Sequence, residues 1–345
     1  MTVSVRSAGK PAAQVRLSGW HARVDAWRAP DVVLRRSPAQ AWFRRRAAGR
    51  LAVLGYHGVE DADAFAAQLD MLCRVAHPVS LAEVEKAVHG GRPLPPHSVL
   101  VTFDDGDATV FADGLPRLAA RGIPAVCFVV PSLLDTDAQF WWEEAVSLWD
   151  HGGTSRHLPF GRGANAQSAV AALKLLPDDE RRLALAELRS TATRPAPPYR
   201  QLTSDEVRAL DAGGVVVGNH TLSHPCLDRC TDARVEEEVT GAHERLTEVL
   251  GHAPTTFAYP NGNVDERADR VLDKLGYRTG FLYNHALADP RSCPPLRIDR
   301  LRVSTTIGPD RLATVLSGLH PAVFRTARGA ARGAARVLQP LARTS

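Results

Sequence analysis

Two neighbouring carboxylates follow an apolar stretch in the segment LVTFDDG, residues 100–106. Asp104 and Asp105 therefore stand at the expected end of a buried strand. A hydrolytic metal site needs one carboxylate that binds the metal and a second, free one that takes a proton from the attacking water. Adjacent residues that leave a strand point in different directions, which suits these two tasks. An Asp–Gly turn that caps a helix would explain one of the two acids.

Two histidines have a spacing that also suits a metal. His220 and His224 form the H-x-x-x-H segment HTLSH. If this segment turns helically, both imidazoles can face one point, and imidazole with a carboxylate is a common ligand set for divalent transition metals. Surface or core histidines also occur at this spacing, so the metal hypothesis depends on the acids at 104 and 105.

The elements that must position these side chains alternate between strand-like and helix-like stretches. We expect strands at 51–56, 98–103, 125–130, 215–220, about 255–260 and 277–283, and helices at 63–76, 109–121, 231–251, 264–275 and 309–319. This alternation predicts a parallel α/β sheet, open or closed. Function in such proteins usually lies at the carboxyl ends of the strands. His57, the two acids, His220 and residues 259–261 would all lie there.

Composition limits the class of protein. The chain has 345 residues with 44% hydrophobic and 23% charged residues, as expected of a globular enzyme. No apolar run approaches the about 20 residues that cross a bilayer, and the N-terminus lacks the apolar region of a secretory signal. Five cysteines, an odd number, suit a reducing compartment, so we expect a cytoplasmic location. Cys226 and Cys230 lack a second cysteine pair, which favours ordinary thiols over structural zinc.

Both ends of the chain are rich in arginine. Residues 1–50 contain only two acids, Asp25 and Asp31, and residues 321–345 contain none. The C-terminal arginines stand three or four apart with apolar residues between them, which suits a helix at an anionic membrane surface. A solvated tail is the alternative. We expect no nucleic-acid binding, because no recognition motif accompanies the charge.

Three motifs together resemble a known family. TFDDG (102–106), HTLSH (220–224) and FAYPNG (257–262), in this order, are similar to the motifs of the polysaccharide deacetylases, the NodB-homology or carbohydrate esterase family 4 enzymes. The resemblance implies an α/β fold, a distorted (β/α) barrel of seven strands. We therefore expect a basic N-terminal extension (1–50), a deacetylase domain (51–320) with a mostly helical insertion at about 135–200, and a basic C-terminal tail (321–345).

The resemblance also implies roles for individual residues. Asp105 would bind the metal together with His220 and His224, and Asp104 would be the general base. Zn²⁺ is the expected ion, although other divalent metals fit the same ligands. The third motif implies that the backbone N–H of Asn261 stabilises the oxyanion.

The chain departs from the family pattern at three points. Ala258 stands where the family often has an arginine that orients the base, and Asn261 stands where an aromatic residue is usual. Arg300 would replace the missing cation, with a plain surface arginine as the alternative. The usual general acid motif is also not evident, and His57 and His320 compete for that role. We favour His57, because it resembles the Tyr-His segment of family members whose motif order is circularly shifted.

The resemblance implies a metal-dependent hydrolase that removes an N-acetyl or other N-acyl group from an amino sugar of a glycan or glycan precursor. We expect it to act in the cytoplasm, with peripheral contact at the inner membrane face if its substrate is lipid-linked. Trp141, Trp142 and Trp149 either stack on sugar rings or form the core of the insertion. Two alternatives stay open: hydrolysis of a non-sugar amide or an O-acetyl ester at the same metal site, and a catalytically silent glycan-binding protein.

Overall fold

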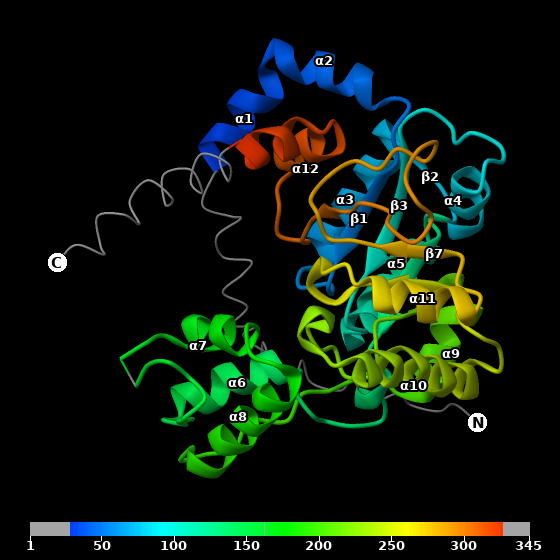
Figure 1. The fold of residues 1–345 in the computed structure, drawn as a ribbon. Helices are drawn as coiled ribbons and strands as arrows, with labels where there is room; N and C mark the ends of the chain where they lie inside the picture. Colours follow the sequence, from blue (N-terminus) through cyan, green and yellow to red (C-terminus); the bar gives the residue numbers. More distant parts are fainter. Residues whose placement is uncertain (1–27, 162, 327–345) are drawn as a thin grey trace, which may run out of the picture.

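The computed structural model describes residues 28–326 except residue 162, and a parallel sheet lies at its centre (Figure 1). Its strands follow the order β7-β6-β5-β4-β3-β1-β8, with the short β2 beside β3. Their bounds are Ala52–Tyr56 for β1, His77–Pro78 for β2, Ser98–Phe103 for β3, Ala125–Val129 for β4, Val215–Asn219 for β5, Thr256–Ala258 for β6, Thr279–Phe281 for β7 and Leu301–Arg302 for β8.

The segment from 298 to 302 joins the two edges of this sheet. Ile298 forms a parallel bridge with Phe281 of β7, and Leu301 pairs with Leu54 of β1. The seven strands of the main path therefore curl into a distorted barrel, and the predicted fold class is confirmed. Every strand in this path runs parallel to its neighbours, so all the carboxyl ends lie at one rim.

Helices surround the barrel. They are α3 (Ala62–Val75), α4 (Leu81–Val88), α5 (Leu115–Ala119), α9 (Ser204–Ala212), α10 (Asp232–Leu250), α11 (Glu266–Lys274) and α12 (Pro309–Leu316). The central strand β3 is buried along its whole length, which explains why it is mostly apolar and does not alternate with charged residues. α10 ends at Gly251, whose positive φ of 77° closes the helix as the sequence predicts.

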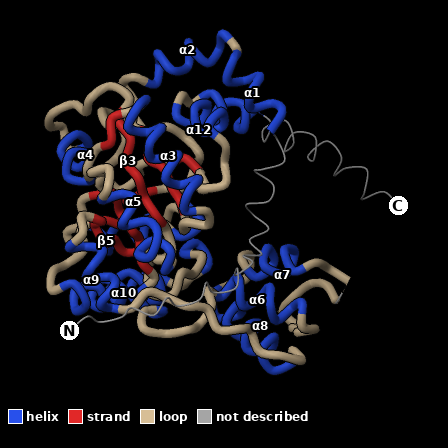
Figure 2. Tube along the Cα trace, turned by 180° about the vertical axis from the view of Figure 1, so that it is seen from behind, coloured by secondary structure: helices blue, strands red, loops and turns tan. Residues whose placement is uncertain are grey.

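Three helices form a lobe beside the barrel (Figure 2). They are α6 (Trp141–Asp150), α7 (Ala166–Leu173) and α8 (Asp178–Thr191), and they share a hydrophobic cluster of their own. We call them the insertion lobe. Trp141 and Trp149 belong to this cluster and are each 8% exposed, so both are core residues of the lobe.

Two further helices, α1 (Arg28–Arg36) and α2 (Pro38–Ala47), lie over α12. Asp31 of α1 forms a buried ion pair with Arg311 of α12, and Gln40 donates to the Ala313 carbonyl. This part of the basic N-terminal segment is therefore attached to the domain. The remaining basic residues of both termini, 1–27 and 327–345, lie outside the described residues. No described helix combines the length and apolarity that a membrane span requires.

The structure corrects several local expectations. The HTLSH segment is an irregular loop and not a helical turn, because Thr221 and His224 both have positive φ values, of 66° and 57°. The helix expected at 109–121 begins with a π-helical turn, Val110–Gly114, before α5. Helices α1, α2 and α4 and the two-residue strands β2 and β8 were not predicted.

Candidate active site

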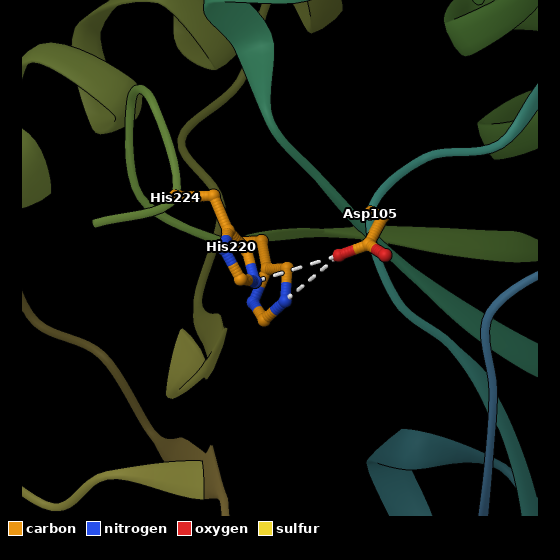
Figure 3. A group of neighbouring side chains, drawn as sticks. All are labelled: Asp105, His220 and His224. Atoms are coloured by element: carbon orange, nitrogen blue, oxygen red, sulfur yellow. Dashed lines mark ion pairs between the residues drawn. The ribbon is translucent and has the colours of Figure 1, made fainter. Parts of the chain in front are cut away.

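Asp105, His220 and His224 converge at the carboxyl ends of β3 and β5 (Figure 3). One carboxylate oxygen of Asp105, Oδ1, lies 3.5 Å from Nε2 of each histidine. Among the described residues, these three form the one cluster of histidine, cysteine or acidic side chains whose ligand atoms could hold a metal ion. Cys226 and Cys230 are not in it, and both are free thiols.

The protein orients both imidazoles through their surroundings. Nδ1 of His220 lies 2.8 Å from the Ala258 carbonyl, so it carries the proton and leaves the Nε2 lone pair toward Asp105. Burial lowers the pKa of His224 to about 3, which keeps this imidazole neutral. Asp105 Oδ1 is buried and has no hydrogen-bond partner among the described residues. A buried oxygen without a hydrogen-bond partner beside two imidazole nitrogens is the donor arrangement that a divalent cation would satisfy.

Arg300 and Asp104 form a bidentate ion pair next to this triad. The guanidinium donates to Oδ1 at 2.6 Å and to Oδ2 at 2.7 Å, and the two residues are 0% and 4% exposed. A further hydrogen bond of 2.7 Å to the Leu282 carbonyl fixes the arginine. Arg300 is therefore a buried residue and not the surface arginine that was the alternative.

The electrostatic surroundings keep Asp104 ionised. Burial alone would raise the pKa of Asp104, but Arg300 outweighs it and holds the pKa below its usual range. Burial likewise opposes ionisation of Asp105, but His220, His57 and His224 together outweigh it, and this pKa also lies below its usual range. Both carboxylates are thus available in the charged form.

His57, directly after β1, is close to both acids. Its charge lowers the pKa of Asp104 and of Asp105, and its ring meets the edge of Tyr283 with centroids 5.4 Å apart. His320 lies elsewhere: within the described part of the chain its ring contacts His285 and Phe324, neither of which belongs to the triad. Of the two candidates for a general acid, His57 is the one that lies beside the carboxylates.

Asn261 lies in the turn after β6, and its conformation is unusual. Its φ and ψ are 57° and 3°, which is left-handed backbone that few side chains favour. The following Gly262 also has a positive φ, of 77°, and an added Cβ would lie 2.7 Å from the Tyr283 nitrogen. The turn is therefore tightly constrained. The Asn261 side chain accepts a hydrogen bond of 2.6 Å from Lys174, the residue that follows α7 of the insertion lobe.

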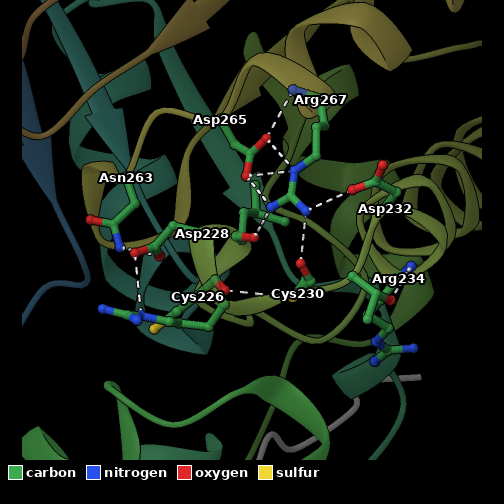
Figure 4. A network of polar contacts seen from close by, with 11 residues as sticks. Cys226, Asp228, Cys230, Asp232, Arg234, Asn263, Asp265 and Arg267 are labelled. Carbon is green, nitrogen blue, oxygen red and sulfur yellow. Dashed lines mark hydrogen bonds and ion pairs between the residues drawn. The ribbon is translucent and has the colours of Figure 1, made fainter.

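A polar network fastens the loop after His224 to the loop after Asn261 (Figure 4). Arg267, at the start of α11, donates to the carbonyls of Leu227 and Cys230 at 2.9 and 2.8 Å. The same guanidinium forms an ion pair with Asp265 at 2.6 Å. One arginine thus holds together the two loops that carry candidate site residues.

Trp142 lies against the triad from the side of the insertion lobe. Its ring centroid is 4.5 Å from that of His224 and 4.9 Å from that of Phe140, with which it stacks. These three residues line part of a cleft of about 750 Å³, with a proline-rich wall at Pro195, Pro197 and Pro198. Of the three tryptophans singled out in the sequence, Trp141 and Trp142 line the cleft, and the ring of Trp142 packs against that of His224.

The family model for polysaccharide deacetylase matches residues 91–280, more than half of the chain. The chain belongs to the polysaccharide deacetylase family. The resemblance inferred from the three motifs is thereby confirmed, and so is the predicted class of enzyme at the level of this family.

Solved structures of polysaccharide deacetylases share the fold. The deacetylase PplD of Streptococcus pyogenes has a TM-score of 0.54 at 17% identity, covering 77% of this chain and 98% of that chain. IcaB from Ammonifex degensii has a TM-score of 0.54 at 22% identity, covering 78% and 96%. At these identities the likeness concerns the fold alone, and it agrees with a deacetylase-type barrel.

A segment of the chain is also similar to a curated deacetylase. Over 61 residues it is 44% identical to the poly-beta-1,6-N-acetyl-D-glucosamine N-deacetylase of Escherichia coli strain K12. This match spans 18% of the present chain and 9% of that relative.

Two residues at this deacetylase site could not be identified from the sequence. Lys174 lies in the insertion, far from the three motifs, and only the fold brings it to Asn261. Tyr283 is a half-buried residue of the strand-like segment 277–283, and its ring centroid lies 5.5 Å from the Arg300 guanidinium. A single sequence marks neither residue, because neither has a characteristic spacing to the acids or histidines.

Proposed function

We propose that this protein is a metal-dependent N-deacetylase that hydrolyses the acetamide of an amino sugar within a glycan. The proposal rests on two sets of side chains that lie together at the carboxyl ends of the barrel strands. One set, Asp105, His220 and His224, has the composition of a metal site. The other is a buried carboxylate, Asp104, held ionised by Arg300. The family assignment supports the same reaction.

The residues fit a divalent cation, and Zn²⁺ suits them best. Two imidazole nitrogens and one carboxylate oxygen form a ligand set that zinc commonly takes in hydrolytic sites. The Asp105 oxygen between them has no other described partner, which also favours a cation. When bound, such an ion would polarise the amide carbonyl and lower the pKa of water.

The chain's own groups supply the proton transfers. Asp104 would take a proton from the attacking water, whose oxygen forms the new bond to the carbonyl carbon. Arg300 keeps this carboxylate ionised and fixes its plane through two hydrogen bonds. The backbone N–H of Asn261 would stabilise the negative charge on the carbonyl oxygen. His57 would then protonate the sugar nitrogen as the C–N bond breaks, which releases acetate and a free amine.

For the substrate we propose a polymer or oligomer of N-acetylglucosamine. The similarity to the Escherichia coli poly-beta-1,6-N-acetyl-D-glucosamine N-deacetylase over 61 residues favours β-1,6 linkages. The cleft beside His224 and Trp142 offers an aromatic and proline-rich wall for sugar units next to the reacting one.

The test is acetate release by the purified protein from N-acetylglucosamine oligomers of β-1,6 and β-1,4 linkage, from a non-sugar acetamide and from an O-acetylated sugar. Each is assayed before chelation, after chelation and after Zn²⁺ is added back. We expect release from the β-1,6 oligomer, its loss on chelation and its return with Zn²⁺. Release only from the ester or the non-sugar amide would contradict the proposed substrate, and release that survives chelation would contradict the metal. No release from any compound would contradict the proposed activity.

A further inference from the structure

Lys174 brings a cation from the insertion lobe into the candidate active site. It follows the last residue of α7, and its ammonium donates a hydrogen bond of 2.6 Å to Oδ1 of Asn261. The Lys174 charge also acts on the metal triad. Burial and His220 are the largest causes of the lowered pKa of His224, and Lys174 lowers it further. The Lys174 side chain is half-buried.

Asn261 needs such support. Its backbone is left-handed, with φ of 57°, a conformation that costs about 1–2 kcal/mol for most residues and less for asparagine. Its side chain is held on both sides, since Oδ1 accepts from Lys174 and Nδ2 donates to Cys226 Sγ at 3.6 Å. The bond to Lys174 is the shorter of the two and comes from a charged donor, which makes it the stronger one.

The insertion lobe is itself fixed against the site, so Lys174 is well placed to hold Asn261. Trp141 of α6 donates from Nε1 to the His224 carbonyl at 2.9 Å. Asp178 of α8 lies 3.4 Å from Arg234 of α10, and Arg234 in turn forms an ion pair of 2.5 Å with the buried Glu238. The lobe thus contacts the barrel through all three of its helices, at α6, α8 and the end of α7.

We propose that Lys174 is a positioning residue for the deacetylation reaction: it holds the Asn261 side chain and thereby fixes the residue 261 N–H at the site of the oxyanion. This inference rests on the proposed function, because it concerns the oxyanion of that reaction. The insertion lobe then has a role in the reaction, because its Lys174 holds the turn after β6 through Asn261. Misplacing a transition-state donor by about 1 Å lowers turnover by up to about 100-fold.

The first test is a double-mutant cycle on kcat with the zinc-loaded full chain and the β-1,6 oligomer. Lys174→Met, which keeps length and removes the ammonium, is combined with Asn261→Ala. We expect each single change to lower kcat about 10- to 100-fold with KM changed less than about threefold, and the double variant to be no slower than Asn261→Ala. Lys274→Met, an exposed lysine on α11, is the matched control and should match the wild type. A normal kcat for Lys174→Met, or losses that multiply, would overturn the proposal.

The second test does not depend on activity. Hydrogen exchange of the backbone amides at 259 and 261–263 is compared between the wild type and Lys174→Met. We expect faster exchange there in the variant, with the zinc content unchanged, whereas unchanged exchange would overturn the proposal. If the wild type hydrolyses none of the substrates, the proposed function fails and the exchange result still decides whether Lys174 fixes the turn. Lys174→Leu, which also lacks a donor, replaces the methionine variant if that one does not fold.

Discussion

Arg300 fixes the orientation of the Asp104 carboxylate, which a positive charge alone would not do. Two parallel hydrogen bonds fix the plane of the carboxylate, and both residues are buried. A lysine at position 300 would keep the charge but offer one point contact instead of a planar fork. The orientation of the proposed base therefore depends on the guanidinium itself.

Arg300→Lys should consequently lower kcat/KM about 10- to 100-fold while zinc binding is kept, because the base is present but misaligned. Steady-state kinetics with the β-1,6 oligomer measure this. Arg302→Lys is the control, since the Arg302 guanidinium donates to the Tyr283 carbonyl. Equal effects of the two substitutions would contradict a specific role of Arg300.

His57 should raise the rate of hydrolysis only for substrates whose leaving group must be protonated. We expect His57→Gln to lower amide hydrolysis about 100- to 10,000-fold, the usual contribution of a general acid. Hydrolysis of an aryl acetate should fall far less, because a phenolate leaves without protonation. The ratio of the two rates in wild type and variant is the measurement. A parallel loss on both substrates would show that His57 is not the acid.

For single residues, the sequence predicts which side chains could form the site but not all of the contacts between them. Asp104, Asp105, His220 and His224 stand out because carboxylates and imidazoles follow apolar runs. Lys174 does not, since a lysine in a helical insertion is ordinary until the fold brings it to Asn261.

Among the elements, the turn after β6 has the tightest steric constraint. Gly262 has φ of 77°, and a Cβ there would lie 2.8 Å from the Tyr283 Cβ and 2.7 Å from its backbone nitrogen. Any side chain would have to displace backbone next to Asn261.

Gly262→Ala should therefore lower both stability, by about 2–4 kcal/mol, and kcat. Urea unfolding and acetate release measure the two effects. Gly251→Ala is the matched control: its φ is also 77° but nothing lies within 4 Å of the added Cβ, so it should cost about 1 kcal/mol and leave kcat unchanged. If the two variants behave alike, the contact with Tyr283 is not what constrains the turn.

The strands that were predicted accurately are those long and apolar enough to give a recognisable sequence pattern. The sequence predicts β3 to the residue, and β1, β4 and β5 to within one residue, because each is a mostly buried run in which apolar side chains dominate. β2 and β8 have two residues each, too few for any periodicity. The HTLSH loop was misjudged, because positive φ at Thr221 and His224 leaves no mark in their residue types.

For the whole molecule, long-range contacts complete the barrel. The 298–302 segment closes the sheet, and α1 is joined to α12 by the buried Asp31–Arg311 ion pair across 280 positions of sequence. Only the general type of barrel could be predicted from the sequence, through the family resemblance. The attachment of α1 could not, because a basic segment near the chain start has the composition of a solvated extension.

Asp31→Ala should lower the free energy of unfolding by about 3–5 kcal/mol, because it leaves the Arg311 charge buried without its partner. Thermal and urea unfolding test this, and kcat should be unchanged at a temperature where the variant is folded. Glu248→Ala is the control: it removes an exposed ion pair with Arg245 and should cost at most about 1 kcal/mol. A similar small loss for Asp31→Ala would mean that α1 contributes little to the stability of the domain.

The most direct measurement of the central claim is zinc content by native mass spectrometry together with acetate release, made on the same samples of wild type, His224→Ala and Asp104→Asn. We expect one zinc per chain and turnover in the wild type, loss of both in His224→Ala, and zinc without turnover in Asp104→Asn. Full zinc content in His224→Ala, or undiminished turnover in Asp104→Asn, would contradict the assignment of the metal ligands or of the base.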